Sequence, residues 1–300
     1  MTPRLRRSVF AICALFVAVA IVEGHYARGA ASLFHPARKR VTDDDKARAR
    51  EALVGLEEVS FRTRDGLRLD AFYVPSRNGA SVVMGHGVGT NRMQLFDEAR
   101  LLARHGYGLL MFDFRAHGES EGDLSTWGDR EQGDVAAAVD FASARSDVTG
   151  GRIAALAFSM GGYAMTQEVA ADPRVRAMVV EATYPDFESE FRALMGRRGL
   201  VSLWPAQATA RYYGVPVERI RPVDHIGAIA PRPLLMVVGS NDPDAPLPQV
   251  QRLFDAAGQP KQLYVVQRAE HGGYARVAPE EYERVLTGFL DAALLGTRPR

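Results

Sequence analysis

Six short apolar runs, separated by longer stretches of helical periodicity, constrain the fold of this 300-residue chain most strongly. The runs lie at residues 81–84, 108–112, 153–158, 175–180, 234–238 and 262–266. The amphipathic stretches between them include 94–104, 134–144 and 248–256. Continuous apolar strands that alternate with helices are typical of a parallel sheet covered by helices on both faces. The pattern therefore predicts an α/β fold built on such a sheet.

Residues 58–74 predict an antiparallel hairpin ahead of the parallel strands. Apolar and polar residues alternate on both sides of Asp65-Gly66, a favoured two-residue turn, and Pro75 ends the second strand. The hairpin brings the expected number of strands to eight. We assign residues 57–295 to this one α/β domain.

The connection between Val180 and Pro233 breaks the alternation, because it contains no convincing strand. It is rich in aromatic and apolar residues instead. An insertion of this size in a compact domain is usually a functional lid or cap. We predict a small helical cap at about 184–222 that covers an acyl or aryl group. The alternative is an extra helix packed against the edge of the sheet.

Ser159 lies between the apolar run 153–158 and a predicted helix over 163–171, within Ala157-Phe158-Ser159-Met160-Gly161. A serine on a sharp turn between a buried strand and a helix is the nucleophile elbow of serine hydrolases. A serine that merely caps an ordinary helix fits the same position. The catalytic interpretation therefore requires a base, an acid that orients it, and donors for an oxyanion.

His271 and Asp242 follow the last two apolar runs, as Ser159 follows an earlier one. The carboxyl ends of parallel strands meet at the edge where open α/β sheets bind ligands, so we expect the three side chains to converge there. Histidine can take the serine proton near neutral pH, and an aspartate fixes the tautomer of the ring. Asp244 and Asp186 are alternative acids.

Two loops at the same edge can complete the site. The loop His86-Gly87-Val88-Gly89 follows the first parallel strand and can offer a backbone N–H to a substrate oxygen. The second donor would be the N–H of Met160, at the start of the helix. Residues 113–120 are interpreted as a structural loop that supports the site. A metal site at His86 and His117 lacks any tight ligand spacing.

Together these motifs resemble the α/β-hydrolase superfamily over about residues 55–295. The similarity rests on His86-Gly87, Asp113-Phe114-Arg115-Ala116-His117-Gly118-Glu119-Ser120, Ala157-Phe158-Ser159-Met160-Gly161-Gly162, Gly239-Ser240-Asn241-Asp242 and His271-Gly272. The chain is most similar to bacterial membrane-anchored or exported serine hydrolases that begin with a hydrophobic segment and an Asp-Gly hairpin.

The resemblance implies that Ser159 is the nucleophile, His271 the base and Asp242 the acid. It also implies an oxyanion hole formed by the N–H groups of Val88 and Met160, and no cofactor or metal. Two residues depart from the family pattern, because Ala157 and Ala116 each stand where glycine is usual. Serine at position 159 argues against the dehalogenase and epoxide-hydrolase branches, which use aspartate there.

We therefore expect a carboxylic ester hydrolase that acts on a small-molecule acyl ester. A peptidase or amidase of the same superfamily is one alternative, and an acyl-thioesterase is another. A non-catalytic binding protein on the same scaffold is the third. Fold alone does not decide among them.

The N-terminus resembles a signal anchor or signal peptide, since Arg4, Arg6 and Arg7 precede an uninterrupted apolar run at 9–22. Those fourteen residues would span roughly 21 Å as a helix, against ~30 Å for a hydrocarbon core. We expect residues 1–34 to be an uncleaved membrane anchor, with a charged linker or helix at 35–56 and the catalytic domain outside the cytoplasm. A cleaved signal and a secreted or periplasmic protein is the alternative.

Charge and cysteine content exclude several other classes. The formal net charge is +1 and the arginines are spread along the chain, so no nucleic-acid partner is expected. The only cysteine, Cys13, lies in the apolar segment. The remainder of the chain therefore has no thiol for disulfides, zinc binding or cysteine catalysis.

Overall fold

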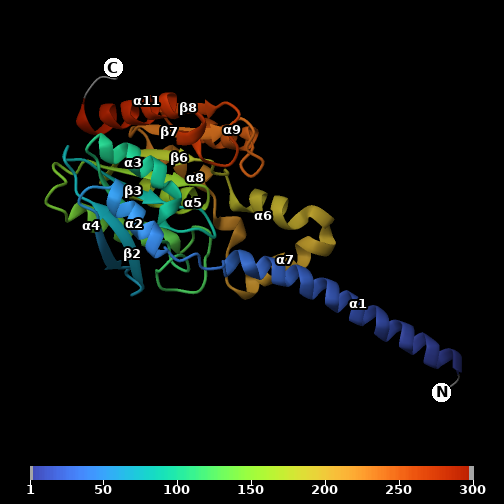
Figure 1. Cartoon of the computed structure of the whole chain (residues 1–300). Helices are drawn as coiled ribbons and strands as arrows, with labels where there is room; N and C mark the ends of the chain where they lie inside the picture. The colour runs from blue at the N-terminus through green and yellow to red at the C-terminus, as the bar shows by residue number, and fades with distance from the viewer. Residues whose placement is uncertain (1–2, 297–300) are drawn as a thin grey trace.

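One eight-stranded sheet organises the body of the molecule, in a computed structural model that describes residues 3–296 (Figure 1). The strands follow the order β1-β2-β4-β3-β5-β6-β7-β8. They are β1 (Glu57–Arg62), β2 (Arg68–Val74), β3 (Ser81–Gly85), β4 (Gly108–Phe112), β5 (Ile153–Phe158), β6 (Val175–Glu181), β7 (Leu234–Gly239) and β8 (Lys261–Val266). β2 pairs antiparallel with both β1 and β4, and the other neighbours are parallel. The predicted mostly parallel sheet with a leading hairpin is confirmed.

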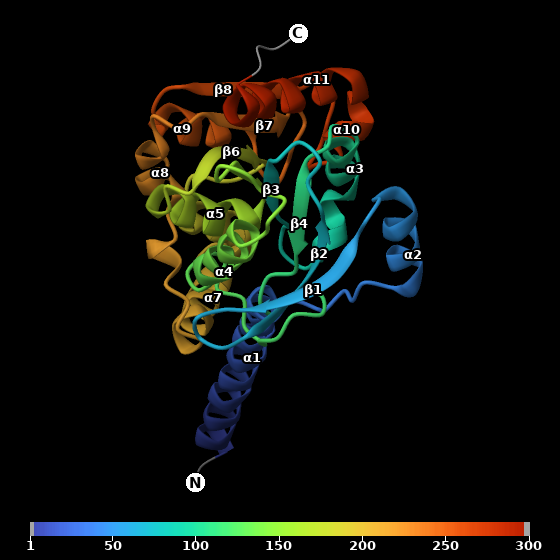
Figure 2. The same cartoon turned by 90° about the vertical axis from the view of Figure 1, so that its left-hand side faces the viewer.

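Helices cover both faces of this sheet (Figure 2). They are α3 (Phe96–Arg104), α4 (Glu131–Ser143), α5 (Met160–Ala171), α8 (Pro222–His225), α9 (Leu247–Ala256), α10 (Tyr274–Val277) and α11 (Pro279–Leu290). On one face α3, α10 and α11 are neighbours, and α4, α5, α8 and α9 form the layer on the other. The short helix α2 (Asp43–Ala52) lies ahead of β1 and begins with a capping box at Thr42.

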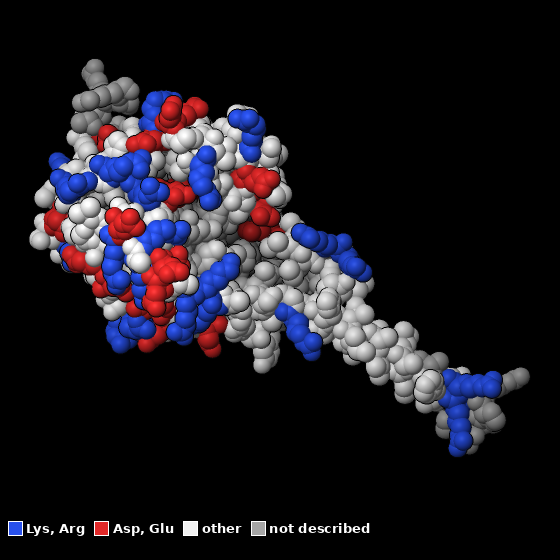
Figure 3. Space-filling model, viewed as in Figure 1, with Lys and Arg blue, Asp and Glu red and all other residues white. Residues whose placement is uncertain are grey.

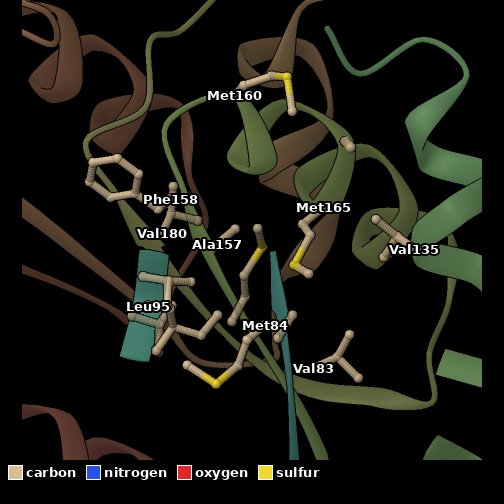
Figure 4. Packing of buried hydrophobic residues seen from close by; sticks show 14 of the residues in the cluster. Val83, Met84, Leu95, Val135, Ala157, Phe158, Met160, Met165 and Val180 are labelled. Carbon is tan, nitrogen blue, oxygen red and sulfur yellow. The ribbon is translucent and has the colours of Figure 1, made fainter. Parts of the chain in front are cut away.

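Burial on both faces explains the apolar runs of the sequence. Every residue of β3, β4, β5 and β7 is buried, whereas β1 alternates half-buried and exposed residues at the sheet edge. Figure 4 shows the core where β3 and β5 meet α5, with Met84 and Val83 beside Ala157 and Met165. The strands that lead to Ser159 and Asp242, β5 and β7, are therefore fully buried, whereas β8, which leads to His271, is mostly half-buried at the other edge of the sheet.

The long connection between β6 and β7 is helical. It contains α6 (Phe187–Met195), a short turn of 3₁₀-helix at Gly196–Arg198, α7 (Leu200–Tyr212) and a second 3₁₀ turn at Val217–Arg219. The ring of Phe187 stacks on that of Trp127 with centroids 4.5 Å apart, which ties α6 to the body. In Figure 1, α6 and α7 stand away from the sheet on the side of the N-terminal helix.

The N-terminal helix α1 (Pro3–Phe34) continues well beyond the apolar run of the sequence. Its C-terminal end belongs to the body, because Ala30 and Phe34 are completely buried and Phe34 stacks on Phe191 of α6 at 6.2 Å. The Leu33 carbonyl accepts a hydrogen bond from the indole N–H of Trp127 at 2.9 Å. The rest of α1 projects from the body (Figure 1). By length and composition alone, α1 is able to cross a membrane.

Close packing at the start of α5 leads to the first prediction. A Cβ on Gly162 would lie 2.0 Å from Oγ1 of Thr183, a side chain that itself donates to the Ser159 carbonyl at 2.9 Å. We expect Gly162→Ala to destabilise the protein by about 1–3 kcal/mol, since such overpacking forces side chains and backbone to shift. Urea unfolding of the full chain in detergent measures this change.

Gly196→Ala is the matched control, because nothing lies within 4 Å of a Cβ at that position. We expect its free energy of unfolding to differ little from that of the wild type. Equal stabilities for the two variants would contradict the close approach of α5 to the end of β6.

Candidate active site

Ser159 sits on the turn between β5 and α5 in a strained backbone conformation, with φ 51° and ψ −121°. Such a conformation is costly for a residue with a side chain and persists only where the surroundings enforce it. Here the Ser159 N–H donates to the Glu181 carbonyl at 2.9 Å, and its own carbonyl accepts from Thr183. The Ser159 side chain makes no capping hydrogen bond to α5. A helix cap therefore does not account for this serine.

The structure brings together three side chains that the sequence places far apart. Nε2 of His271 lies 3.1 Å from Oγ of Ser159. Nδ1 of the same ring lies 2.9 and 3.0 Å from the two carboxyl oxygens of Asp242. A carboxylate can only accept, so Nδ1 carries the proton and Nε2 is free to accept from the serine hydroxyl.

Local contacts fix the loops that carry His271 and Asp242. Asp242 Oδ1 accepts the backbone N–H groups of Asp244 at 2.9 Å and Ala245 at 2.7 Å. The N–H of Asn241 donates to the carbonyl of Ala269 at 2.9 Å, which joins the loop after β7 to the loop after β8. The separation of histidine and carboxylate is thus set by backbone hydrogen bonds.

The electrostatics of the site favour a charged imidazole. Burial of the ring opposes a positive charge on His271, but the hydrogen bond and the negative charge of Asp242 outweigh it. The carboxylates of Asp244 and Glu190 act in the same direction. The pKa of His271 therefore lies above its ordinary value of 6.5.

The two alternative acids occupy other positions. Asp186 accepts the backbone N–H of Ser189 at 2.7 Å and caps the first turn of α6. Asp244 lines the cavity in front of Ser159. Within residues 3–296, Asp242 is the carboxylate that forms a hydrogen bond with His271.

The loop after β3 is fixed by a buried histidine. The Phe114 N–H donates to His86 Nε2 at 3.1 Å, so the opposite nitrogen of the ring carries the proton and donates to the Gly87 carbonyl at 2.7 Å. Burial lowers the pKa of His86 to about 3, which keeps the ring neutral. Within the described residues, neither the Val88 nor the Met160 N–H donates a hydrogen bond. Both groups are therefore available to a ligand.

The loop 113–120 packs against the loop after β3, since its Phe114 N–H donates to His86. Asp113 is buried and accepts the backbone N–H groups of Arg92 at 2.6 Å and Glu119 at 2.9 Å. A Cβ on Gly118 would lie 2.0 Å from this carboxylate. Ala116 adopts φ 61°, the left-handed conformation that favours glycine, so the turn keeps its form at some cost in strain.

A cavity of about 420 Å³ opens in front of Ser159. Val88 and His271 lie on the sheet side of this cavity, and Glu190, Leu194 and Arg197 line it from α6 and the turn that follows. The described residues contain no cluster of three or more histidine, cysteine or acidic side chains that could hold a metal ion.

Several lining residues were not found from the sequence, and Leu33, Trp127 and Glu190 are examples. Leu33 comes from α1 and Trp127 from the loop before α4, and neither carries a local motif. Glu190 accepts a hydrogen bond from the Tyr163 hydroxyl, and desolvation raises the pKa of its carboxyl to about 7. Glu190 is one of four acidic residues in the predicted cap, so no local pattern singled it out.

Comparison with known proteins places this chain in a family. The family model for serine aminopeptidases of type S33 matches residues 76–214. Rv2307c, an uncharacterized protein of Mycobacterium tuberculosis, is 30% identical over 255 residues, covering 80% of this chain and 81% of that protein. YfhR of Escherichia coli, also uncharacterized, is 24% identical over 247 residues, covering 79% and 81%.

Solved structures share the fold. An esterase of Pyrococcus furiosus, Pf2001, superposes with a TM-score of 0.73 at 22% identity, covering 87% of this chain and 98% of that one. The α/β hydrolase GrgF of Penicillium gives a TM-score of 0.67 at 20% identity, covering 81% and 100%. The chain belongs to the α/β-hydrolase superfamily and is a hydrolase, as its sequence motifs predict.

The state of His271 provides the second prediction. In protein with ¹³C-labelled histidines, NMR should show His271 titrating above pH 6.5, and Asp242→Asn should lower this pKa, because the negative charge beside Nδ1 is lost. His86 is an internal control, and its signal should stay neutral from about pH 5 to 8. A His271 pKa that does not respond to Asp242→Asn would contradict the described contact.

Proposed function

We propose that this hydrolase cleaves carboxylic esters of small molecules through an acyl-enzyme formed on Ser159. The observation that carries the proposal is the unbroken hydrogen-bond chain from Ser159 through His271 to Asp242, which begins at a strained serine. Serine is a weak nucleophile as an alcohol, and a base within hydrogen-bond distance activates it.

In the first half-reaction, Ser159 Oγ attacks the ester carbonyl carbon while His271 Nε2 takes the hydroxyl proton. The carbonyl π electrons move onto its oxygen, which the N–H groups of Val88 and Met160 stabilise. The tetrahedral intermediate then collapses, the C–O bond to the alcohol breaks, and His271 returns the proton to the departing oxygen. Asp242 stays ionised and orients the ring throughout.

In the second half-reaction, water attacks the acyl carbon and His271 accepts its proton. Collapse of this intermediate breaks the bond to Oγ, releases the acid and restores Ser159. No cofactor takes part in these steps. Because His271 must be neutral at the start of each half-reaction, activity should fall as the pH drops through the raised pKa of His271.

An amide bond is the second candidate substrate. The matching family model describes serine aminopeptidases, and the Glu190 carboxyl lies at the cavity where it could face an amine. The assignment as an ester hydrolase is supported by structural relatives that are named esterases. Acyl thioesters and a non-catalytic role are further outcomes that experiment can separate.

We further propose that α1 is retained as a membrane anchor in the bacterial cell membrane, with the catalytic domain outside the cytoplasm. Cleavage near residues 27–31 would remove most of the helix from which Leu33 and Phe34 reach the body. The absence of cysteine from residues 14–300 suits an oxidising compartment.

The third prediction tests the nucleophile and its acid. A fluorophosphonate probe should label the wild type and not Ser159→Ala. Asp242→Asn should lower turnover of a p-nitrophenyl ester by roughly 10³–10⁴-fold, because the imidazolium loses its orienting charge.

Asp186→Asn is the matched control, because asparagine also caps a helix and Asp186 lies at the start of α6. We expect turnover close to that of the wild type. A large loss in this variant with little loss in Asp242→Asn would assign the acid differently. Folded wild type that resists labelling would argue for a binding protein.

The fourth prediction concerns the bond cleaved. Purified full-length protein should hydrolyse p-nitrophenyl esters with a higher kcat/KM than aminoacyl anilides or acyl thioesters of matched acyl group. A preference for anilides would replace the esterase assignment with an amidase, and a preference for thioesters would replace it with a thioesterase.

A further inference from the structure

The outer face of the cap helix α7 is unusual for a helix in water. Leu200 is 80% exposed, Val201 59% and Trp204 60%, while Leu203 and Ala206 on the inner face are buried. A helix at a water-facing surface ordinarily presents polar residues on its outer side. Contiguous exposed apolar groups of this kind mark an interaction site.

These residues lie directly beside the apolar part of α1. A groove of about 520 Å³ is lined by Val19 and Val22 from α1 and by Leu200, Val201 and Trp204 from α7, with the half-buried Glu23 at its side. A second groove runs farther along the same two helices and ends at Tyr212, which is 84% exposed. Figure 3 shows the middle of α1 as a surface without charge that leads onto the body.

The position of α7 compensates for the short apolar run of α1. Fourteen apolar residues span roughly 21 Å, which leaves such a helix short of a ~30 Å hydrocarbon core. Leu200, Val201 and Trp204 add apolar surface at the C-terminal end of that run. Tryptophan and tyrosine, here Trp204 and Tyr212, are the residues that concentrate at the boundary between acyl chains and headgroups.

Basic residues border the same surface. Arg197 and Arg198 are exposed in the turn before α7, and Arg211 is exposed near its end. Cationic side chains beside an apolar helical face are typical of helices that lie at the surface of anionic bilayers.

We propose that α7 docks into the surface of a lipid bilayer beside α1, through Leu200, Val201, Trp204 and Tyr212. The two helices then form one membrane-facing surface, and the cap lies in the headgroup layer. This docking is independent of the bond that the enzyme cleaves.

Docking has a consequence for the substrate, and this part rests on the proposed ester hydrolysis. Leu33 lines the catalytic cavity and lies eleven residues after Val22, or roughly 17 Å along the helix. Leu194 and Arg197 line the same cavity next to α7. Amphiphilic acyl esters held in the bilayer would thus reach Ser159 from the membrane side.

The two tryptophans of the chain allow a direct test, because Trp127 is 1% exposed and Trp204 is 60% exposed. The full chain is reconstituted in vesicles of three parts phosphatidylcholine to one part phosphatidylglycerol. Phosphatidylcholine brominated on its acyl chains should quench the tryptophan fluorescence, and Trp204→Phe should remove the quenched component. Quenching of Trp204 by aqueous iodide but not by brominated lipid would overturn the proposal. Protection from both quenchers would overturn it in favour of a second copy.

A matched pair of variants extends the test. Val201→Asp places a charge on the docking face, and Val54→Asp makes the same change at a valine that is 82% exposed on the body. We expect Val201→Asp alone to weaken lipid quenching of Trp204 and to slow hydrolysis of a long-chain ester in the vesicles several-fold. A soluble short ester in detergent should be hydrolysed equally by both. Identical behaviour of the two variants in vesicles would contradict docking, whereas loss of all ester turnover in wild type would contradict only the proposed function.

Discussion

The backbone of Ser159 is the constraint on which the site depends. Its positive φ is maintained because its N–H donates to the carbonyl of Glu181, the last residue of β6, and its carbonyl accepts from the hydroxyl of Thr183, just after β6. Gly161 and Gly162 let α5 approach the ends of β3 and β6 at distances that no side chain would permit. The backbone strain at Ser159 is therefore offset by hydrogen bonds to the end of β6 and by close packing of α5, and not by contacts of the serine side chain. Ala157, which replaces the usual glycine before the turn, is fully buried in β5 without disturbing this arrangement.

The same sheet explains why so much could be predicted from the sequence. Strands buried on both faces have few polar residues, so β3 to β7 are visible as apolar runs, and the edge strand β8 keeps enough apolar residues to be found as well. The parallel direction of these strands means that the loops at their carboxyl ends share one edge. His271 and Asp242 could be selected because each directly follows a strand. The structure places His271 within hydrogen-bond distance of both Asp242 and Ser159, and the catalytic roles are a proposal.

The rest of the site depends on contacts between distant segments, which no local pattern reveals. Leu33 reaches the cavity because α1 remains helical past its apolar run. Its carbonyl accepts a hydrogen bond from the indole N–H of Trp127, which is 94 positions away in the sequence. Glu190 gains its raised pKa from burial beside Tyr163, which depends on how α6 packs on α5. Ala116 shows the opposite case, because the surrounding hydrogen bonds impose a conformation that its residue type disfavours.

The packing of the C-terminal end of α1 against the catalytic domain has a practical consequence for the preparation of this protein. Removal of an apolar N-terminal helix is the customary route to a water-soluble sample. Here a cut after Phe34 would strip one wall from the catalytic cavity, uncover the ring of Phe191 and leave the Trp127 indole N–H without its acceptor. Soluble material obtained in that way would report on a site with altered shape, so a cut at the end of the apolar run, which spares Ala30 to Phe34, preserves more of the native enzyme.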